Sequence, residues 1–135
     1  MFLPLNNKFL IQIFGLLSQK KYTEAEKNVL DILSGVVENR SEKGKENYLV
    51  FLEVLYNDFD FYYRKWLQKK GLSDGLLEDN TTHIEHDQNY FLHHCSNPGK
   101  MNDLLWELGV CLMTKKDIKN RKRIVNTIEK YRKIY

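Results

Sequence analysis

The chain has 135 residues, 42% of them apolar and 29% charged, with a formal net charge of +3. This is ordinary globular composition, and a chain of this length buries enough surface for one core without disulfide staples. Two cysteines do not make a disulfide framework, so we interpret them as reduced thiols in a cytoplasmic protein. With only two prolines and seven glycines, long helices are favoured over tight turns, and a single helical domain is expected over residues 1–135.

An apolar stretch near the N-terminus, FLIQIFGLL (9–17), predicts a buried first helix from about Lys8 to Gln19, capped by Asn6 or Asn7. It is too short to span a bilayer, which needs about 20 apolar residues. Lys8 is the one basic residue before this stretch, and no A-x-A cleavage site follows it. Neither a membrane segment nor a signal peptide is therefore expected.

The second predicted helix opens with Thr23 and Glu26, which have the spacing of a T-x-x-E capping box. Its apolar residues recur every three or four positions and so share one face. They are Ala25, Val29, Ile32, Leu33 and Val36. The stretch KYTEAEKNVLDIL (21–33) resembles the second helix of a tetratricopeptide repeat at Tyr22 and Ala25, and this resemblance implies a helical hairpin. No second copy follows about 34 residues on, so an array of such repeats is not expected.

A long third helix is predicted from about Glu46 to Lys69, apolar on two sides. Such a helix is central in its bundle or covered by a partner. Its core face is expected to be Tyr48, Phe51, Leu52, Leu55, Phe59, Tyr62 and Trp66, and its second row Leu49, Tyr56, Tyr63 and Leu67.

Five of the nine residues in DFDFYYRKW (58–66) are aromatic, and one helix cannot turn all of them into a core. Tyr, Trp and Arg are also the residue types that anchor protein interfaces. This pattern makes Tyr56, Phe61, Tyr63 and Arg64 candidate partner-binding residues, with ordinary surface aromatics as the alternative.

All four histidines and Cys95 lie in HIEHDQNYFLHHC (83–95), where Thr82 and Glu85 predict a capped short helix. On one continuous helix, His93 and His94 lie roughly 10 Å beyond His83 and His86, too far for one metal ion. The surrounding segment 71–99 has five acidic residues and no Lys or Arg, which favours protonated imidazole. We therefore expect a pH-sensitive surface with raised histidine pKa values and no metal. A metal site is the alternative, with the candidate ligands His83, His86, Asp87, His93, His94 and Cys95.

After an SNPG turn (96–99), a helix is predicted from about Asn102 to Met113, through Leu104, Leu105, Trp106, Leu108, Cys111 and Leu112. A last helix, capped by Thr114 or Asp117, is predicted to reach about Arg132. Its apolar face is expected to be Ile118, Ile124, Val125, Ile128 and Tyr131.

Residues 114–135 contain nine basic and two acidic residues, a net charge of +7. We expect this segment and the acidic segment to lie on different surfaces, with the basic one available to an acidic partner. The candidate contacts are Lys119, Arg121, Lys122 and Arg123. Nucleic acid is the alternative partner, since LWELGVCLMTKKDIKNRKRI loosely resembles a helix-turn-helix with Gly109 near its turn.

No glycine-rich phosphate loop, G-x-S-x-G or H-E-x-x-H motif occurs, so neither an enzyme nor a cofactor is expected. The sequence is interpreted as an all-α, single-domain bundle of five or six helices. Its expected function is to bind another macromolecule, most of all a protein, as an adaptor, an inhibitor or an immunity-type protein. The alternatives are a nucleic-acid-binding protein that uses the last helix and a metal-binding protein that uses 83–95.

Overall fold

The computed structural model describes residues 4–39, 41–72, 90–114 and 118–133, and of 118–120 the backbone alone. Of these residues 87% are helical and none is in a strand. The prediction of an all-α bundle is thus confirmed for the described ranges. The elements are η1 (Pro4–Asn6), α1 (Lys8–Ser18), α2 (Tyr22–Asn39), α3 (Glu42–Asn57), α4 (Phe59–Lys69), α5 (Tyr90–His93), α6 (Pro98–Thr114) and α7 (Ile118–Arg132).

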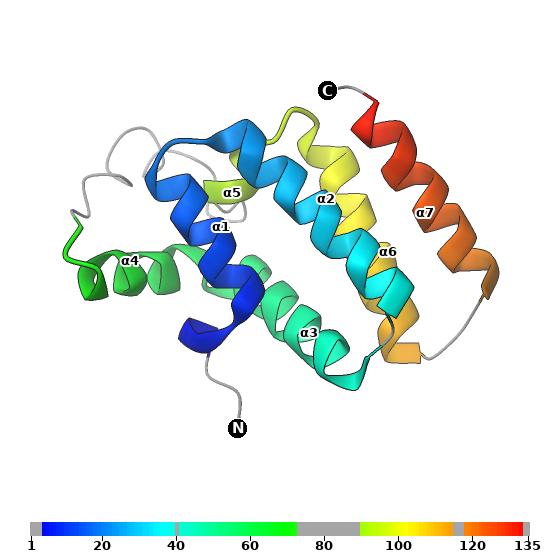
Figure 1. The fold of residues 1–135 in the computed structure, drawn as a ribbon, viewed down its shortest axis with the longest axis horizontal. Helices are drawn as coiled ribbons and strands as arrows, with labels where there is room; N and C mark the ends of the chain where they lie inside the picture. Colours follow the sequence, from blue (N-terminus) through cyan, green and yellow to red (C-terminus); the bar gives the residue numbers. More distant parts are fainter. Residues whose placement is uncertain (1–3, 40, 73–89, 115–117, 134–135) are drawn as a thin grey trace.

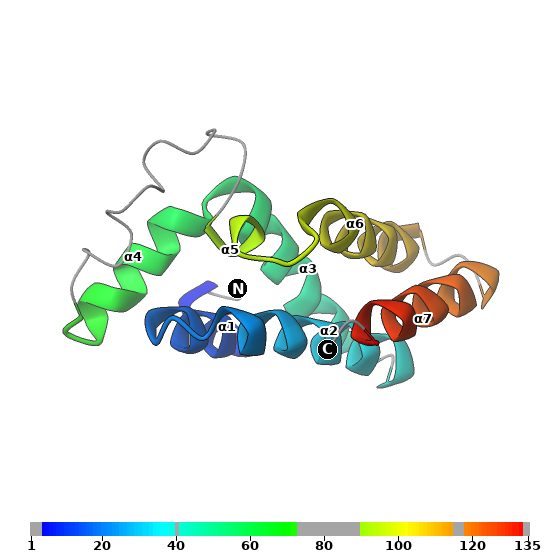
Figure 2. The ribbon, with the colours of Figure 1, turned by 90° about the horizontal axis from the view of Figure 1, so that it is seen from above.

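The helices pack in two layers (Figures 1 and 2). One layer holds α1, α2 and α7, with α2 between its two neighbours. The other layer holds α4, α3, α5 and α6, and α3 contacts α1 and α2 across the interface between the layers. The apolar core fills this interface. Its largest fully buried side chains are Tyr48, Tyr63, Tyr131, Phe14, Phe51 and Phe91.

The first two helices form the hairpin that the sequence predicts. Asn7 is the N-cap of α1, and its Oδ1 accepts a hydrogen bond from the Leu10 N–H at 3.0 Å. Its Nδ2 donates to the Asn47 carbonyl at 2.8 Å, so the cap also ties α1 to α3. The predicted apolar face of α2 is buried at all five positions, and α1 and α2 pack closely.

The predicted capping box of α2 is wrong. The helix begins at Tyr22, and the Lys21 carbonyl accepts its first hydrogen bond, from the Ala25 N–H at 2.9 Å. Thr23 therefore lies inside the first turn, where it is exposed. Glu26 turns inward instead and is 2% exposed, because distant hydrogen-bond donors compete for its carboxylate.

The segment predicted as one helix over 46–69 is two helices. α3 begins earlier, after Ser41, whose Oγ accepts from the Gly44 N–H at 3.0 Å, and it ends at Asn57. Asp58 has a non-helical backbone, with φ −141° and ψ 35°, and α4 starts at Phe59. This break brings the described α-helices to seven and changes the helical phase, so Tyr63 rather than Tyr62 enters the core.

The α6 helix begins four residues before the predicted start. Asn97 caps it, with its Oδ1 accepting from the Lys100 N–H at 3.1 Å, and Pro98 holds the first helical position, which proline favours. The helix continues past Gly109 to Thr114, so the turn that a helix-turn-helix requires is absent from this helix. Gly109 permits close packing, since a Cβ there would lie 2.5 Å from Leu52 Cδ1.

No helix in the described ranges has the length and apolar character needed to cross a membrane.

Candidate functional site

Three apolar side chains are exposed in a row on α6. Trp106, Val110 and Met113 are 49%, 46% and 59% exposed, and their spacing of four and three residues places them on one helix face. We call these three residues the α6 stripe. The opposite face of the helix enters the core through Met101, Leu104, Leu105, Leu108 and Cys111.

Tyr56, a predicted partner-binding residue, supports the α6 stripe from α3. Its ring centroid lies 5.1 Å from that of Trp106, and its hydroxyl donates to Asn102 Oδ1 at 2.7 Å. Burial, followed by the nearby Asp103 carboxylate, raises the pKa of Tyr56, so the hydroxyl stays protonated as a donor. Tyr56 therefore positions Trp106 while its own polar end is already bonded.

A groove of about 220 Å³ lies between two residues of the α6 stripe, Trp106 and Val110, and α7. Arg123 of α7 lines it, and its Nη1 lies 2.8 Å from Glu107 Oε1 of α6. The predicted contact Arg123 thus lies beside Trp106 and Val110, in a position fixed by an ion pair. The sequence pointed to the arginine but not to the apolar side chains next to it.

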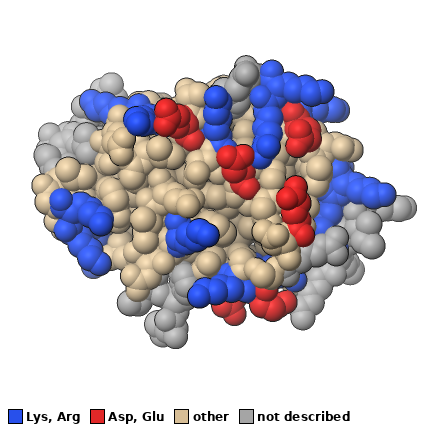
Figure 3. Space-filling model, in the orientation of Figure 1, with Lys and Arg blue, Asp and Glu red and all other residues tan. Residues whose placement is uncertain are grey.

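The other predicted contacts of α7 are only partly described. Arg121 is half-buried and Lys122 is exposed, while the Lys119 side chain lies outside the described residues. At the far end of the helix Arg132 pairs with Asp31 of α2 at 2.6 Å. On this face basic and acidic side chains alternate over α2 and α7 (Figure 3), so the positive charge is not one unbroken patch.

The aromatic residues of α4 do not join the α6 stripe. α4 and α7 lie at opposite ends of the bundle (Figures 1 and 2). Phe61 is 52% exposed, with the Lys65 ammonium 4.8 Å from its ring centroid, and Arg64 is half-buried. The prediction that Tyr63 binds a partner is wrong: its side chain is fully buried and stacks on Phe14, with ring centroids 5.3 Å apart.

The end of the histidine segment packs on α2. The His94 ring stacks on Tyr22 at 3.8 Å, His93 is exposed, and the Cys95 thiol is buried and donates to the Phe91 carbonyl at 3.5 Å. The His93 and His94 ring centroids lie 5.3 Å apart, but no group of three candidate metal ligands occurs in the described part of the chain. The remaining candidate ligands, His83, His86 and Asp87, lie outside the described residues.

The predicted rise in histidine pKa is wrong for His94. Burial, followed by the adjacent His93, lowers the pKa of His94. The acidic residues Asp74, Glu78, Asp79, Glu85 and Asp87, which motivated the prediction, are outside the described ranges, as is much of the acidic segment. The expected separation of acidic and basic surfaces therefore stays a prediction.

A buried carboxylate joins the end of this segment to the rest of the bundle. Glu26 accepts hydrogen bonds from the Ser96 N–H at 2.7 Å and the Tyr131 hydroxyl at 2.5 Å. Burial, with the Glu26 carboxylate beside it, raises the pKa of the Cys95 thiol. A neutral buried thiol is a poor nucleophile, so this cluster serves structure and gives no activated cysteine.

Comparison of the chain with known proteins identified no relative. No protein-family model matches the chain, and no similar curated protein or solved structure was found. The function is therefore argued from the surfaces described above.

Proposed function

We propose that the protein binds another protein and catalyses no reaction, as an adaptor, an inhibitor or an immunity-type protein does. The observation that carries this proposal is the α6 stripe. Contiguous exposed apolar side chains mark interaction surfaces, and tryptophan is enriched among the residues that dominate binding energy. About half of the Trp106 side chain is left for a partner to cover.

The partner that fits this surface is a protein segment with apolar side chains flanked by Asp or Glu. The apolar side chains would cover the α6 stripe. The acidic ones would meet basic side chains of α7, of which Arg121 is half-buried and Lys122 is exposed. Within the described residues, Arg121 and Lys122 have no ion pair to neutralise them. Such complementarity speeds association and selects acidic partners.

Site-specific photo-cross-linking tests the proposal. Benzoylphenylalanine replaces Val110 in one variant and Phe61, exposed on α4, in a control variant. In cells that make the protein, we expect a protein cross-linked from position 110 and not from position 61. Cross-linking only to nucleic acid would favour the nucleic-acid alternative, and cross-linking only to the chain itself would make the α6 stripe a self-association surface.

The identified partner is then purified and its affinity measured by calorimetry. Trp106→Ala should weaken binding about 30-fold, the effect of losing a hot-spot side chain, while Phe61→Ala should leave the affinity unchanged. Replacing Arg121, Lys122 and Arg123 together with Ala should weaken binding most at low salt, where screening is least. Full affinity in the Trp106→Ala variant would contradict the proposal.

A further inference from the structure

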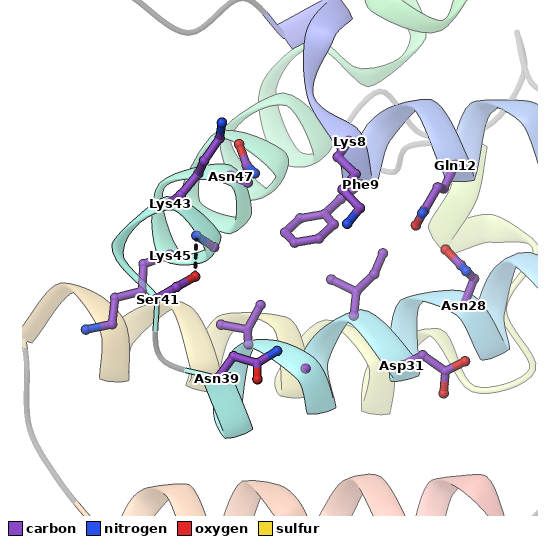
Figure 4. A pocket seen from close by; sticks show the side chains of 14 residues that line it. Lys8, Phe9, Gln12, Asn28, Asp31, Asn39, Ser41, Lys43, Lys45 and Asn47 are labelled. Carbon is purple, nitrogen blue, oxygen red and sulfur yellow. Dashed lines mark hydrogen bonds between the residues drawn. The ribbon is translucent and has the colours of Figure 1, made fainter.

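A cavity of about 620 Å³ lies between the start of α1, the part of α2 from Asn28 to Asn39 and the start of α3. Phe9 projects into it from α1, and Asn39 and Ser41 mark one end while Gln12 and Asn28 mark the other (Figure 4). Its volume is within the range of about 300–1,000 Å³ that small-molecule sites occupy. It lies on elements other than those that carry the α6 stripe.

Two amide oxygens of residues that line this cavity lack hydrogen-bond partners among the described residues. Asn28 Oδ1 and Asn47 Oδ1 are buried, and neither has a partner among the described residues. Asn47 is only 7% exposed. An unpaired buried amide is costly, so a molecule that brings hydrogen-bond donors to this position would recover that loss.

The same cavity is positive on one side. The N-termini of α1 and α3 both border it, and a helix N-terminus carries a partial positive charge. α1 nevertheless places Lys8 at its first position, with no acidic residue in that turn to balance it. The Lys8 side chain reaches toward the space in the middle of the labelled residues, whereas Lys45 points away from it (Figure 4). Asp31, the acidic lining residue, is paired with Arg132 at 2.6 Å.

Gly35 keeps the floor of the cavity open. It lies in the interior of α2 beside Ile32 and Val36, which also line the cavity. A Cβ at this position would meet nothing within 4 Å, so packing does not require a glycine there. Alanine is the better residue in a helix interior. The missing side chain leaves room for the flat or chain-like body of a ligand.

We infer that this cavity binds a small carboxylic acid whose apolar body carries hydroxyl or amino groups. The carboxylate contacts Lys8, where the positive charge and the α1 N-terminus attract it. The apolar body lies over Gly35, between Phe9 and Ile32. The hydroxyl or amino groups donate to the amide oxygens of Asn28 and Asn47.

Titration with defined probes, followed in two-dimensional NMR spectra of the whole chain, tests this inference. The probes are para-hydroxyphenylacetate and its neutral amide, para-hydroxyphenylacetamide. The acid should shift the signals of Phe9, Ile32 and Gly35 and bind about tenfold more tightly than the amide, the difference of one charge-assisted contact. Equal binding of the two probes, or shifts confined to other parts of the chain, would overturn it.

Three variants locate the site. Gly35→Leu fills the cavity and should abolish binding, while Gly35→Ala, the control for helix stability, should retain it. Lys8→Gln should weaken the acid about tenfold and leave the amide unaffected, and Lys65→Gln, which removes an exposed lysine of α4, should change neither. Undiminished binding of the acid by Gly35→Leu or by Lys8→Gln would refute the assignment, and the second variant decides the matter if the first does not fold.

Discussion

Two tyrosines in the core are equally buried but differ in hydrogen bonding. Tyr48 and Tyr63 are both 0% exposed. The Tyr48 hydroxyl donates to the Leu105 carbonyl at 3.1 Å, whereas the Tyr63 hydroxyl has no hydrogen-bond partner in the described part of the chain. Burial raises the pKa of both side chains, so both stay neutral. The difference between them is therefore one hydrogen bond.

Replacing each tyrosine with phenylalanine should change stability in opposite directions. Tyr63→Phe removes a buried hydroxyl that pays a desolvation cost without a bond, and should raise the free energy of unfolding by about 1 kcal/mol. Tyr48→Phe removes the hydrogen bond to the Leu105 carbonyl and should lower the free energy of unfolding by about 1 kcal/mol. Urea denaturation of both variants and the parent chain measures this. A loss of stability in the Tyr63→Phe variant would mean that its hydroxyl has a partner.

His94 should make stability depend on pH. Its pKa in the folded chain is lowered by burial against Tyr22 and Tyr90 and by His93, so the unfolded chain binds more protons. Its contribution is full above the unfolded pKa of about 6.5 and is lost as pH falls through the folded value. In urea denaturation at about pH 8 and pH 5, the parent chain should lose more stability than His94→Phe, which keeps the ring stack. An equal loss in both would assign the pH dependence to other groups.

At the scale of whole helices, substitutions at the N-termini of α1 and α2 test where each helix begins. Asn7→Ala removes the cap of α1 and its bond to the Asn47 carbonyl, and should cost about 1–2 kcal/mol. Thr23→Ala alters an exposed side chain inside the first turn of α2 and should change stability by less than about 0.5 kcal/mol. Denaturation midpoints of the two variants measure both effects. A loss of about 1 kcal/mol in the Thr23→Ala variant would instead support the predicted role of Thr23 as the N-cap of α2.

Much of this arrangement follows from the apolar period, and the exceptions have physical causes. The apolar period correctly predicts the buried face of α2, because the long-range contacts there agree with the local pattern. For α1 the sequence predicts a buried helix without naming its face, and Leu10, Ile13, Phe14 and Leu17 are the residues that it buries. No Gly or Pro occurs at the helix break at Asp58. The sequence therefore does not predict which face of α4 is buried, or that Tyr63 lies in the core. Glu26 does not cap α2 but accepts hydrogen bonds from Ser96 and Tyr131, which lie 70 and 105 residues away, and no local pattern encodes such contacts.

The candidate surface was predicted only in part for a related reason. Tyr56 and Arg123 were singled out, and both border the α6 stripe. Trp106 was named only among the apolar residues of its predicted helix, because periodicity finds apolar rows but does not say which row a neighbouring helix covers. The position of α7 decides this, and it leaves Trp106, Val110 and Met113 exposed.

For the molecule as a whole, α7 is the helix that closes the bundle. It packs against α2 and α6. Among its described side chains, Ile124, Ile128 and Tyr131 are buried, with exposures of 0%, 1% and 0%. Arg132 and Arg123 pair with α2 and α6 on its two sides. Apolar burial rather than these exposed ion pairs should therefore hold α7 in place.

Two substitutions in α7 test this order of importance. Ile128→Ala should lower the free energy of unfolding by about 2–5 kcal/mol, as a truncation in a packed core does. Arg132→Ala should cost less than about 1 kcal/mol, because its pair with Asp31 is largely open to solvent and screened. Urea denaturation at low and high salt measures both. A larger loss of unfolding free energy for Arg132→Ala than for Ile128→Ala would mean that ion pairs contribute more than apolar burial to holding α7.

The bond between Glu26 and Tyr131 joins residues 105 positions apart in the chain. During synthesis at about 5–20 residues per second, about 5–20 seconds pass between the synthesis of Glu26 and that of Tyr131, whose hydroxyl donates to its carboxylate. Until then α2 carries, on the face that enters the core, a carboxylate without one of its hydrogen-bond donors. Translation therefore sets the earliest moment of closure, and nascent chains that stop short of residue 131 should remain open to proteases and chaperones.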